Sequence, residues 1–185
     1  MAKRYTELND RLIAFIRAQK IYFVGTAAAT GNVNVSPKGM DSLLVTGPNR
    51  VLWLNVTGSG NESAAHLLLN PRMTLMFCAF EGTPLILRLY GTARSIHPGD
   101  PQWQEMLAQF PPIPGPRQLY DFAIDLVQTS CGMAVPFFDY QDERQQLNDL
   151  ALKIGEDGLR EYREAKNQFS IDGFPTLIVE KSAPH

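Results

Sequence analysis

Apolar residues recur with two different periods along the 185-residue chain. Near the N-terminus, Leu8, Leu12, Phe15 and Ile16 lie at helical spacing between charged residues, which predicts an amphipathic helix within residues 5–19. From there to about residue 130, short apolar or alternating segments are separated by glycine, proline and asparagine. That pattern is typical of strands joined by turns, so the sequence predicts a β-rich body after one helix.

The predicted strands follow one another closely. They cover residues 21–28, 33–36, 43–46, 51–56, 73–80, 85–96 and 122–127. Residues 73–80 are apolar nearly throughout, which predicts a strand buried on both faces. No ten-residue helical crossover joins the early strands, and parallel pairing would require one. We therefore predict a mainly β fold with flanking helices, an antiparallel barrel rather than a parallel Rossmann sheet.

Helices are expected at the edges of this barrel. Short helices are predicted after residue 61, ending at Asn70-Pro71, and around residues 101–110; the proline-rich FPPIPGPR that follows is interpreted as a rigid connector. Residues 142–154 and 156–166 predict a helical C-terminal tail. The expected organisation is one domain over residues 1–185, with the barrel at about 20–130 and the tail at about 140–170.

Composition excludes several classes of partner. The chain is 44% hydrophobic with net charge −2 and no basic block, so neither nucleic acid nor an anionic membrane surface is an expected partner. It has no apolar run of ~18 residues and no signal segment, which indicates a cytoplasmic protein. Two cysteines and three scattered histidines (Cys78, Cys131, His66, His97 and His185) predict buried thiols in a reducing compartment and no metal site.

The turn Gly58-Ser59-Gly60-Asn61 lies between a predicted strand and a predicted helix. Ser59 and Glu62 have the spacing of a capping box, in which each side chain satisfies a backbone N–H group at the helix start. The remaining N–H groups and the helix dipole favour an anion such as phosphate. A helix that is merely well capped explains the same pattern, and the carboxylate of Glu62 would repel an anion unless the box holds it.

Two cations on predicted strands have two interpretations each. Lys38, in Ser36-Pro37-Lys38-Gly39, is either a solvated lysine at a turn or part of a polar site with Ser36 and Asn34, which share one face. Arg88 shares a strand face with Ile86 and Tyr90, and in so apolar a strand it requires an anionic partner. That partner is either a carboxylate across the sheet or a ligand.

With these elements placed, the chain resembles the FMN-binding split-barrel family related to pyridoxamine 5'-phosphate oxidase. The resemblance rests on IYFVGTAAATGNVNVSPKG, VLWLNVTGSGNES, AHLLLNPRMTLMF and LRLYGTARSI, in that order, and SCGMAVPFFDYQDER looks like a subgroup of uncharacterised flavin-binding relatives. It implies a homodimer of split barrels with FMN in a groove between them. The implied cofactor-binding residues are Ser36, Lys38, Gly39, Trp53, Leu54, Asn55, Ser59, Gly60, Asn61, Ser63 and, near the flavin or across the dimer, Arg88.

In this assignment Lys38 meets the phosphate, the turn and Ser63 donate hydrogen bonds to it, and residues 53–55 flank the flavin. The chain also departs from the family pattern. Oxidases of the family usually have Ser-Arg-Lys where this chain has Asn61-Glu62-Ser63, and they end in an Arg-Leu-x-Pro motif that this chain lacks. Oxidation of vitamin B6 itself is therefore not expected.

The resemblance implies an FMN-dependent oxidoreductase that acts on an unidentified small molecule. Two alternatives use the same barrel. One is a flavin or haem binding or storage protein without turnover, in which His66 or Cys131 would be the axial haem ligand. The other is a deazaflavin-dependent reductase. Cys131 beside Gly132 could also be a reactive thiol, although no histidine partner is evident nearby.

Overall fold

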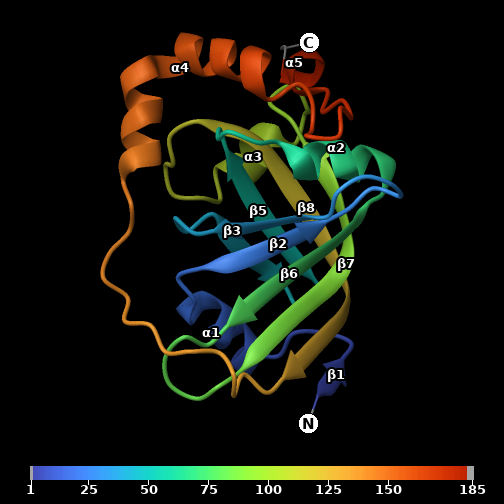
Figure 1. Ribbon diagram of the computed structural model, residues 1–185, viewed down its shortest axis with the longest axis vertical. Helices are drawn as coiled ribbons and strands as arrows, with labels where there is room; N and C mark the ends of the chain where they lie inside the picture. Colours follow the sequence, from blue (N-terminus) through green and yellow to red (C-terminus); the bar gives the residue numbers. More distant parts are fainter. Residues whose placement is uncertain (1, 183–185) are drawn as a thin grey trace.

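The computed structural model describes residues 2–182 (Figure 1). Its strands are β1 (Lys3–Tyr5), β2 (Tyr22–Thr26), β3 (Asn34–Lys38), β4 (Leu43–Gly47), β5 (Arg50–Val56), β6 (Arg72–Cys78), β7 (Ile86–Ile96) and β8 (Pro116–Ser130). Its helices are α1 (Asp10–Ala18), α2 (Glu62–Leu69), α3 (Trp103–Leu107), α4 (Gln146–Lys166) and α5 (Ile178–Ser182). The described chain is thus a β-rich body with helices at its ends.

The strands form one antiparallel sheet in the order β3-β2-β6-β7-β8-β5-β4, and β1 also pairs with β8. The sheet curls, so that β2 and β3 cross in front of β5 and β8 (Figure 1). Its two outermost strands, β3 and β4, are consecutive in sequence, yet no ladder joins them within residues 2–182. The barrel is therefore split between β3 and β4, and the prediction of an antiparallel split barrel is confirmed.

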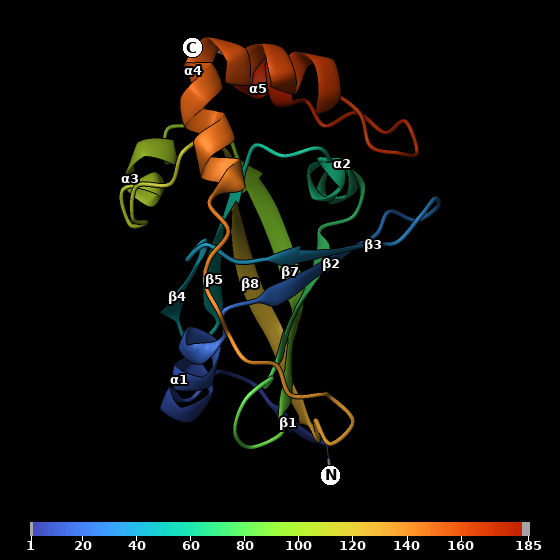
Figure 2. The ribbon, with the colours of Figure 1, turned by 60° about the vertical axis from the view of Figure 1, so that its left-hand side comes forward.

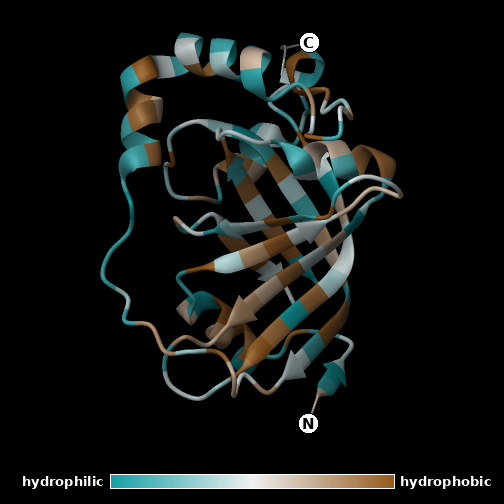
Figure 3. Ribbon diagram, in the orientation of Figure 1, coloured by the Kyte–Doolittle hydropathy of each residue, from teal (hydrophilic) through white to brown (hydrophobic). Residues whose placement is uncertain are grey.

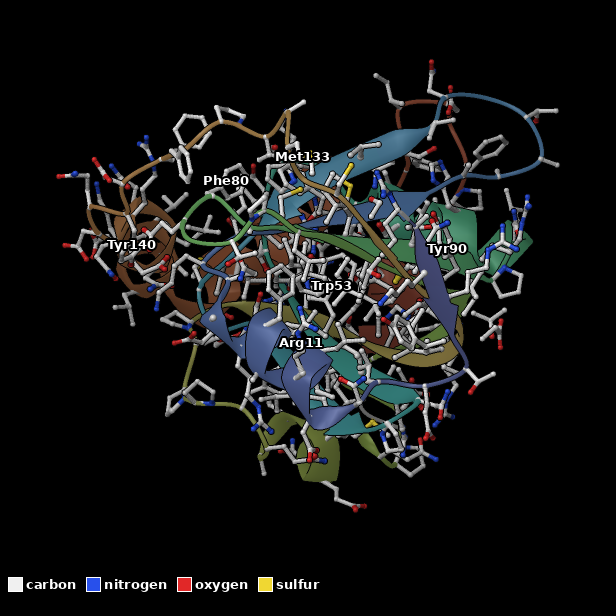
Figure 4. The ribbon with its side chains drawn as sticks, turned by 90° about the horizontal axis from the view of Figure 1, so that it is seen from below. Arg11, Trp53, Phe80, Tyr90, Met133 and Tyr140 are labelled. Carbon is white, nitrogen blue, oxygen red and sulfur yellow. The ribbon has the colours of Figure 1, made fainter. Side chains whose placement is uncertain are left out.

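Alternate residues of each strand fill the barrel. Trp53 stacks on Tyr120 with ring centroids 4.5 Å apart, and Tyr22 stacks on Phe77 at 5.8 Å. Seen from below, Trp53 lies inside the ring of strands, whereas Met133 and Tyr140 lie outside it (Figure 4). Each fully buried side chain of this size contributes roughly 1.5–3 kcal/mol to folding.

The helices close the ends of the barrel. α1 covers one end with Leu12 and Ile16, and it begins at Asn9, whose side-chain oxygen accepts from Leu12 N at 3.0 Å. α2, α4 and α5 lie together at the other end (Figures 1 and 2). Hydrophobic positions concentrate on the strands, while the segment that leads into α4 is hydrophilic (Figure 3). The open edge of the barrel thus lies close to a mostly polar C-terminal region.

The structure corrects several sequence-based boundaries. β8 has 15 residues and begins at Pro116, so the end of the predicted proline-rich connector belongs to a strand. β6 alternates: Met73, Leu75 and Phe77 are buried, whereas Thr74 and Met76 are only partly covered, so its predicted burial on both faces is wrong for the single chain. β1 and α5 were not predicted, because elements of three and five residues carry too little periodicity.

The predicted break between two tail helices is confirmed at Gly155. This residue has φ 65° and ψ −177° inside α4, a backbone conformation that is open to glycine but strained for other residues. The two halves of α4 consequently run in different directions (Figures 1 and 2). Ala151 in the first half and Leu159 in the second are both buried and both contact the position of Gly115, so the bend fits the helix around the loop before β8.

Gly91 is required by close contact within the sheet. The pairing of β7 with β8 shifts register between Tyr90 and Gly91, and a Cβ atom on Gly91 would overlap the carbonyl oxygen of Ala123.

We expect Gly91→Ala to lower the free energy of unfolding by about 2–3 kcal/mol, because the backbone of two central strands must separate. Gly47→Ala is the matched control, since its Cβ would meet only the Arg50 side chain at 4.0 Å. Urea unfolding measures both; equal midpoints would contradict the close contact.

Candidate functional site

One cavity lies along the split of the barrel and has a volume of about 410 Å³. Its walls are β3 and the turn after it, the second half of β5, the turn at 58–61 and the start of α2, with one residue each from β8 and α4. The lining residues are Asn34, Ser36, Pro37, Lys38, Gly39, Met40, Ser42, Trp53, Leu54, Asn55, Val56, Gly58, Ser59, Gly60, Asn61, Glu62, Ser63, Arg117 and Leu147. The structure thus brings together ten of the eleven predicted cofactor-binding residues, whose binding role remains a prediction.

Hydroxyl and amide groups connect β3 to α2 across one wall. Asn34 Nδ2 donates to Ser63 Oγ and to Thr26 Oγ1, each at 3.3 Å, and Ser36 Oγ donates to Asn34 Oδ1 at 3.0 Å. Asn34 and Ser36 therefore share one face of β3, as their spacing predicts, and that face lines the cavity. Small polar groups fix the spacing between β3 and the helix start.

Lys38 is half-buried beside the central aromatic pair of the barrel. Its Nζ atom lies 5.4 Å from the centroid of the Trp53 ring. Burial, and to a smaller extent the nearby charge of Arg117, together lower the pKa of Lys38 to about 8. Both effects disfavour the ammonium form, so an anion at this position would raise the pKa again. The interpretation of Lys38 as a solvated lysine at a turn does not fit this position.

Arg117 supports the turn from behind. Its side chain is only 3% exposed. Nη2 donates to Gly60 O at 2.6 Å, and Nη1 donates to Asn167 Oδ1 at 2.7 Å and to Gly58 O at 3.4 Å. With the Asn55 amide turned so that its oxygen faces the guanidinium, Nε and Nη2 also donate to that oxygen at 3.1 and 3.2 Å. All these acceptors are neutral, so the cavity retains the positive charge.

The electrostatic state of Arg117 reflects its depth. Burial lowers its pKa to about 10, and the charge of Arg163 acts in the same direction. Within residues 2–182, its guanidinium makes no ion pair. A buried cation without a carboxylate is costly, and an anionic ligand would offset that cost. The cavity is thus electropositive on the side of the turn.

The turn presents backbone donors to the cavity. No backbone N–H group of residues 58–63 donates to an acceptor within the described part of the chain, and all six residues line the cavity. The carbonyl oxygens of Gly58 and Gly60 are bound to Arg117 instead. A row of unpaired N–H groups at a helix start is suited to an oxyanion.

The predicted capping box is wrong. Asn61, not Ser59, is the N-cap of α2, and no side chain caps the helix. The carboxylate oxygens of Glu62 accept instead from the backbone N–H of Ile171, at 3.1 and 3.2 Å. The tail after α4 offers this donor, and Arg117 binds only carbonyl oxygens of the turn, so no side chain of the described chain caps the N–H groups at the helix start. Glu62 is held, as expected, but by a long-range contact.

Arg88 is the predicted cofactor-binding residue that does not line the cavity. Its Nη1 atom donates to Ser130 Oγ at 3.2 Å on the outer face of the sheet, away from the lining of the cavity. No carboxylate pairs with it in the described chain, so the predicted ion pair across the sheet is wrong.

The alternative chemical candidates also lie elsewhere. His66 is 1% exposed, with Nδ1 3.2 Å from Thr26 Oγ1, and neither it nor Cys131 lines the cavity. Cys131 is exposed, contrary to the expectation of two buried thiols, and both it and Cys78 are free. His185 lies outside the described residues. Among residues 2–182 no cluster of three metal-ligating side chains occurs, and no helix there has the length and apolar character needed to span a bilayer.

Sequence reasoning missed Arg117 and Asn167. Arg117 follows the last proline of FPPIPGPRQ, where a charged residue looks solvated, and Asn167 lies more than a hundred positions after the turn it contacts. The local sequence offers only a weak signal, an arginine a few residues before the predicted strand at 122–127. Long-range contacts of this kind leave no local pattern.

A family model described as pyridoxamine 5'-phosphate oxidase matches residues 8–131, which contain the barrel and most of the cavity. The chain belongs to the pyridoxamine 5'-phosphate oxidase family. The ustO protein of Aspergillus flavus, itself described as a pyridoxamine 5'-phosphate oxidase family protein, is 35% identical over 94% of this chain and 77% of its own. That similarity extends beyond the barrel into the tail.

Two solved structures share the fold. A proposed pyridoxamine 5'-phosphate oxidase of Lactobacillus delbrueckii matches with TM-score 0.53 and 21% identity, over 66% of this chain and 94% of its own. A HupZ variant of Group A Streptococcus matches with TM-score 0.55 and 18% identity, over 66% of this chain and 98% of its own. At these identities the likeness establishes the architecture of this family member, and the chemistry must be argued from its own residues.

The buried guanidinium should be necessary for the stability of this pyridoxamine 5'-phosphate oxidase family member. We expect Arg117→Met to lower the free energy of unfolding by about 3 kcal/mol, because the buried oxygens of Gly58, Gly60 and Asn167 lose their donor. Arg94→Met is the matched control: it removes an exposed pair with Asp121, whose N–O distance is 3.0 Å, and should cost less than about 1 kcal/mol. Chemical denaturation followed by Trp fluorescence measures both, and equal losses would contradict the role of Arg117.

Proposed function

We propose that this chain is an FMN-dependent oxidoreductase that acts, as a homodimer, on an unidentified small molecule. One observation carries the proposal: a cavity at the split of the barrel has an electropositive end made of Lys38, Arg117 and the free N–H groups of residues 58–63. A phosphate monoester matches that end, and an aromatic ring system matches the remainder.

The electropositive end fits a phosphate dianion. Lys38 supplies a mobile charge, the turn supplies N–H donors, and the hydroxyls of Ser36, Ser59 and Ser63 line the same cavity. Hydrogen bonds to a charged group contribute about 1.5–3 kcal/mol each. Glu62 occupies a position at which oxidases of the family usually carry a positive charge, but its carboxylate is bound to the tail. Arg117 provides a positive charge from the other side of the turn.

The rest of the cavity fits a planar ring. Trp53, Leu54, Val56 and Met40 give it apolar surface, and its volume of about 410 Å³ lies within the usual range for small-molecule sites. A bound flavin would supply hydride transfer, while this chain binds the phosphate, orients the ring and excludes water. The residues present therefore fit FMN without a dedicated acid or base.

The outer face of the sheet supports association of two copies. Phe23, Thr74, Met76 and Tyr90 lie on the side of β2, β6 and β7 that faces away from the core, and each is only partly covered in the single chain. Val33, just before β3, and Val35, on β3, remain 72% and 64% exposed. A second copy placed on this face would cover apolar side chains and bring Arg88 into an interface, which is the arrangement expected for a flavin held between two barrels.

The decisive experiment is to identify what co-purifies with the protein. The protein should be yellow, its flavin absorbance should survive gel filtration at the mass of a dimer, and mass spectrometry should identify FMN. Rapid loss of the visible absorbance of the oxidised flavin on addition of NADH or NADPH would establish redox competence. Colourless protein that takes up no added FMN would refute the proposal. Bound FMN that no nicotinamide reduces would indicate storage, and a deazaflavin or haem mass would indicate the other ligands.

The charge of Lys38 should give FMN binding a characteristic pH dependence. In the free site its pKa is lowered to about 8, and only the protonated amine attracts the dianion, so affinity should fall as pH rises through that value. Affinity should also fall below about pH 6, where a phosphate monoester takes up a proton. Lys38→Met should weaken binding at neutral pH by roughly tenfold to a hundredfold and remove the alkaline limb. Quenching of flavin fluorescence measures both; an unchanged alkaline limb in the variant would assign it to another group.

A further inference from the structure

We propose that Asn167, acting through Arg117, is a positioning residue that keeps the turn at 58–61 in the conformation that accepts a phosphate. This inference rests on the proposed flavin site. The residue lies in the tail immediately after α4, on a segment far from the barrel in sequence, and its side chain is 0% exposed. It therefore connects the C-terminal region to the part of the cavity on which phosphate binding would depend.

Asn167 holds both the turn and the arginine behind it. Its Oδ1 accepts from Arg117 Nη1 at 2.7 Å, and its Nδ2 donates to Gly58 O at 2.9 Å. Its backbone carbonyl accepts from Asn61 Nδ2 at 3.3 Å. An amide is the group that suits this place, because one end must accept from a cation while the other donates to a carbonyl.

Further contacts dock the tail on the same turn. Arg163 Nε donates to Thr57 Oγ1 at 2.9 Å, and Ile171 N donates to the carboxylate of Glu62 at 3.1 and 3.2 Å. Behind Asn167, Thr176 Oγ1 donates to its backbone carbonyl at 2.6 Å. The tail therefore contacts both ends of the turn, at residues 57, 58, 61 and 62, and most of these contacts bind carbonyl or side-chain oxygens. The N–H groups of the turn remain free for a ligand.

The choice of asparagine also preserves charge. The acceptors around Arg117 are two backbone carbonyls and two amide oxygens, all neutral. An aspartate at position 167 would still bind the guanidinium, but it would lose the hydrogen bond to Gly58 O and cancel the positive charge beneath the turn. Charge interactions are strong at this depth, so the effect would fall on an anionic ligand and spare a neutral one.

Asn167→Asp tests this inference with a pair of ligands that differ only in the phosphate. We expect its FMN affinity to fall by about tenfold or more, and its riboflavin affinity to change by less than about twofold. Gln168→Glu is the matched control, since it makes the same chemical change one residue later, where the side chain bonds only to Glu164 O, at 2.6 Å. Its FMN affinity should stay within about twofold of the wild type. Equal losses for FMN and riboflavin in Asn167→Asp, or no loss for either, would overturn the role of Asn167.

A second variant tests the positioning without added charge and without any ligand. Thr176→Val removes the hydrogen bond to the Asn167 carbonyl, and Thr176 lies outside the lining of the cavity. In the flavin-free protein, amide hydrogen exchange at Thr57 and Ala65, whose N–H groups lie on either side of the turn and donate to Gly115 O and Asn61 O, should accelerate several-fold, while exchange in β6 and β7 stays unchanged. Unchanged exchange at both amides would overturn the proposal even if flavin binds. If the wild-type protein binds neither FMN nor riboflavin but hydrogen exchange changes as expected, the flavin site is refuted, whereas the role of Asn167 in holding the turn is supported.

Discussion

The buried guanidinium of Arg117 is the interaction on which the geometry of the cavity depends. A cation that is 3% exposed is stable only if its donors find acceptors, and Arg117 finds them in the carbonyls of the turn and in the tail. Those bonds orient the turn so that its carbonyl groups face the guanidinium. The backbone N–H groups of the same turn are left without internal partners. One requirement, the satisfaction of a buried charge, thereby creates a row of donors and an uncancelled positive potential on one side of the cavity.

The split of the barrel determines where this cavity can form. A closed barrel leaves no edge, whereas here β3 and β4 are successive strands at opposite ends of the sheet. Side chains of β3 and the second half of β5 therefore face a gap that the backbone does not close, and Trp53 and Lys38 approach each other there. The tail and α4 cover one end of the gap, and the outer face of β2, β6 and β7 is only partly covered in the single chain.

Contacts from residues distant in sequence compensate for the carboxylate of Glu62 at the start of α2. Relatives with oxidase activity usually place positive charges in this part of the helix start, and a carboxylate there would weaken phosphate binding. In this chain the tail binds that carboxylate through Ile171 N, and the positive charge is provided by Arg117 on the opposite side of the turn. The 35% identity with ustO extends over 94% of this chain, so the comparison includes the tail that makes this exchange possible.

The sequence by itself determined the architecture and most of the cavity. Alternating strands, missing crossovers and the break at Gly155 follow from local periodicity and backbone preference, so the antiparallel barrel and the bent tail were predictable. Ten of the eleven proposed cofactor residues line one cavity, since they lie on two short contiguous segments of the chain, and their binding role remains a prediction. Tertiary structure alone decided the rest. Arg117 and Asn167 are 50 positions apart, and Glu62 and Ile171 are 109 apart. Pairs at such separations meet only when the barrel has closed and α4 has folded over it, because a hydrogen bond between distant residues has no periodicity that a local pattern could show.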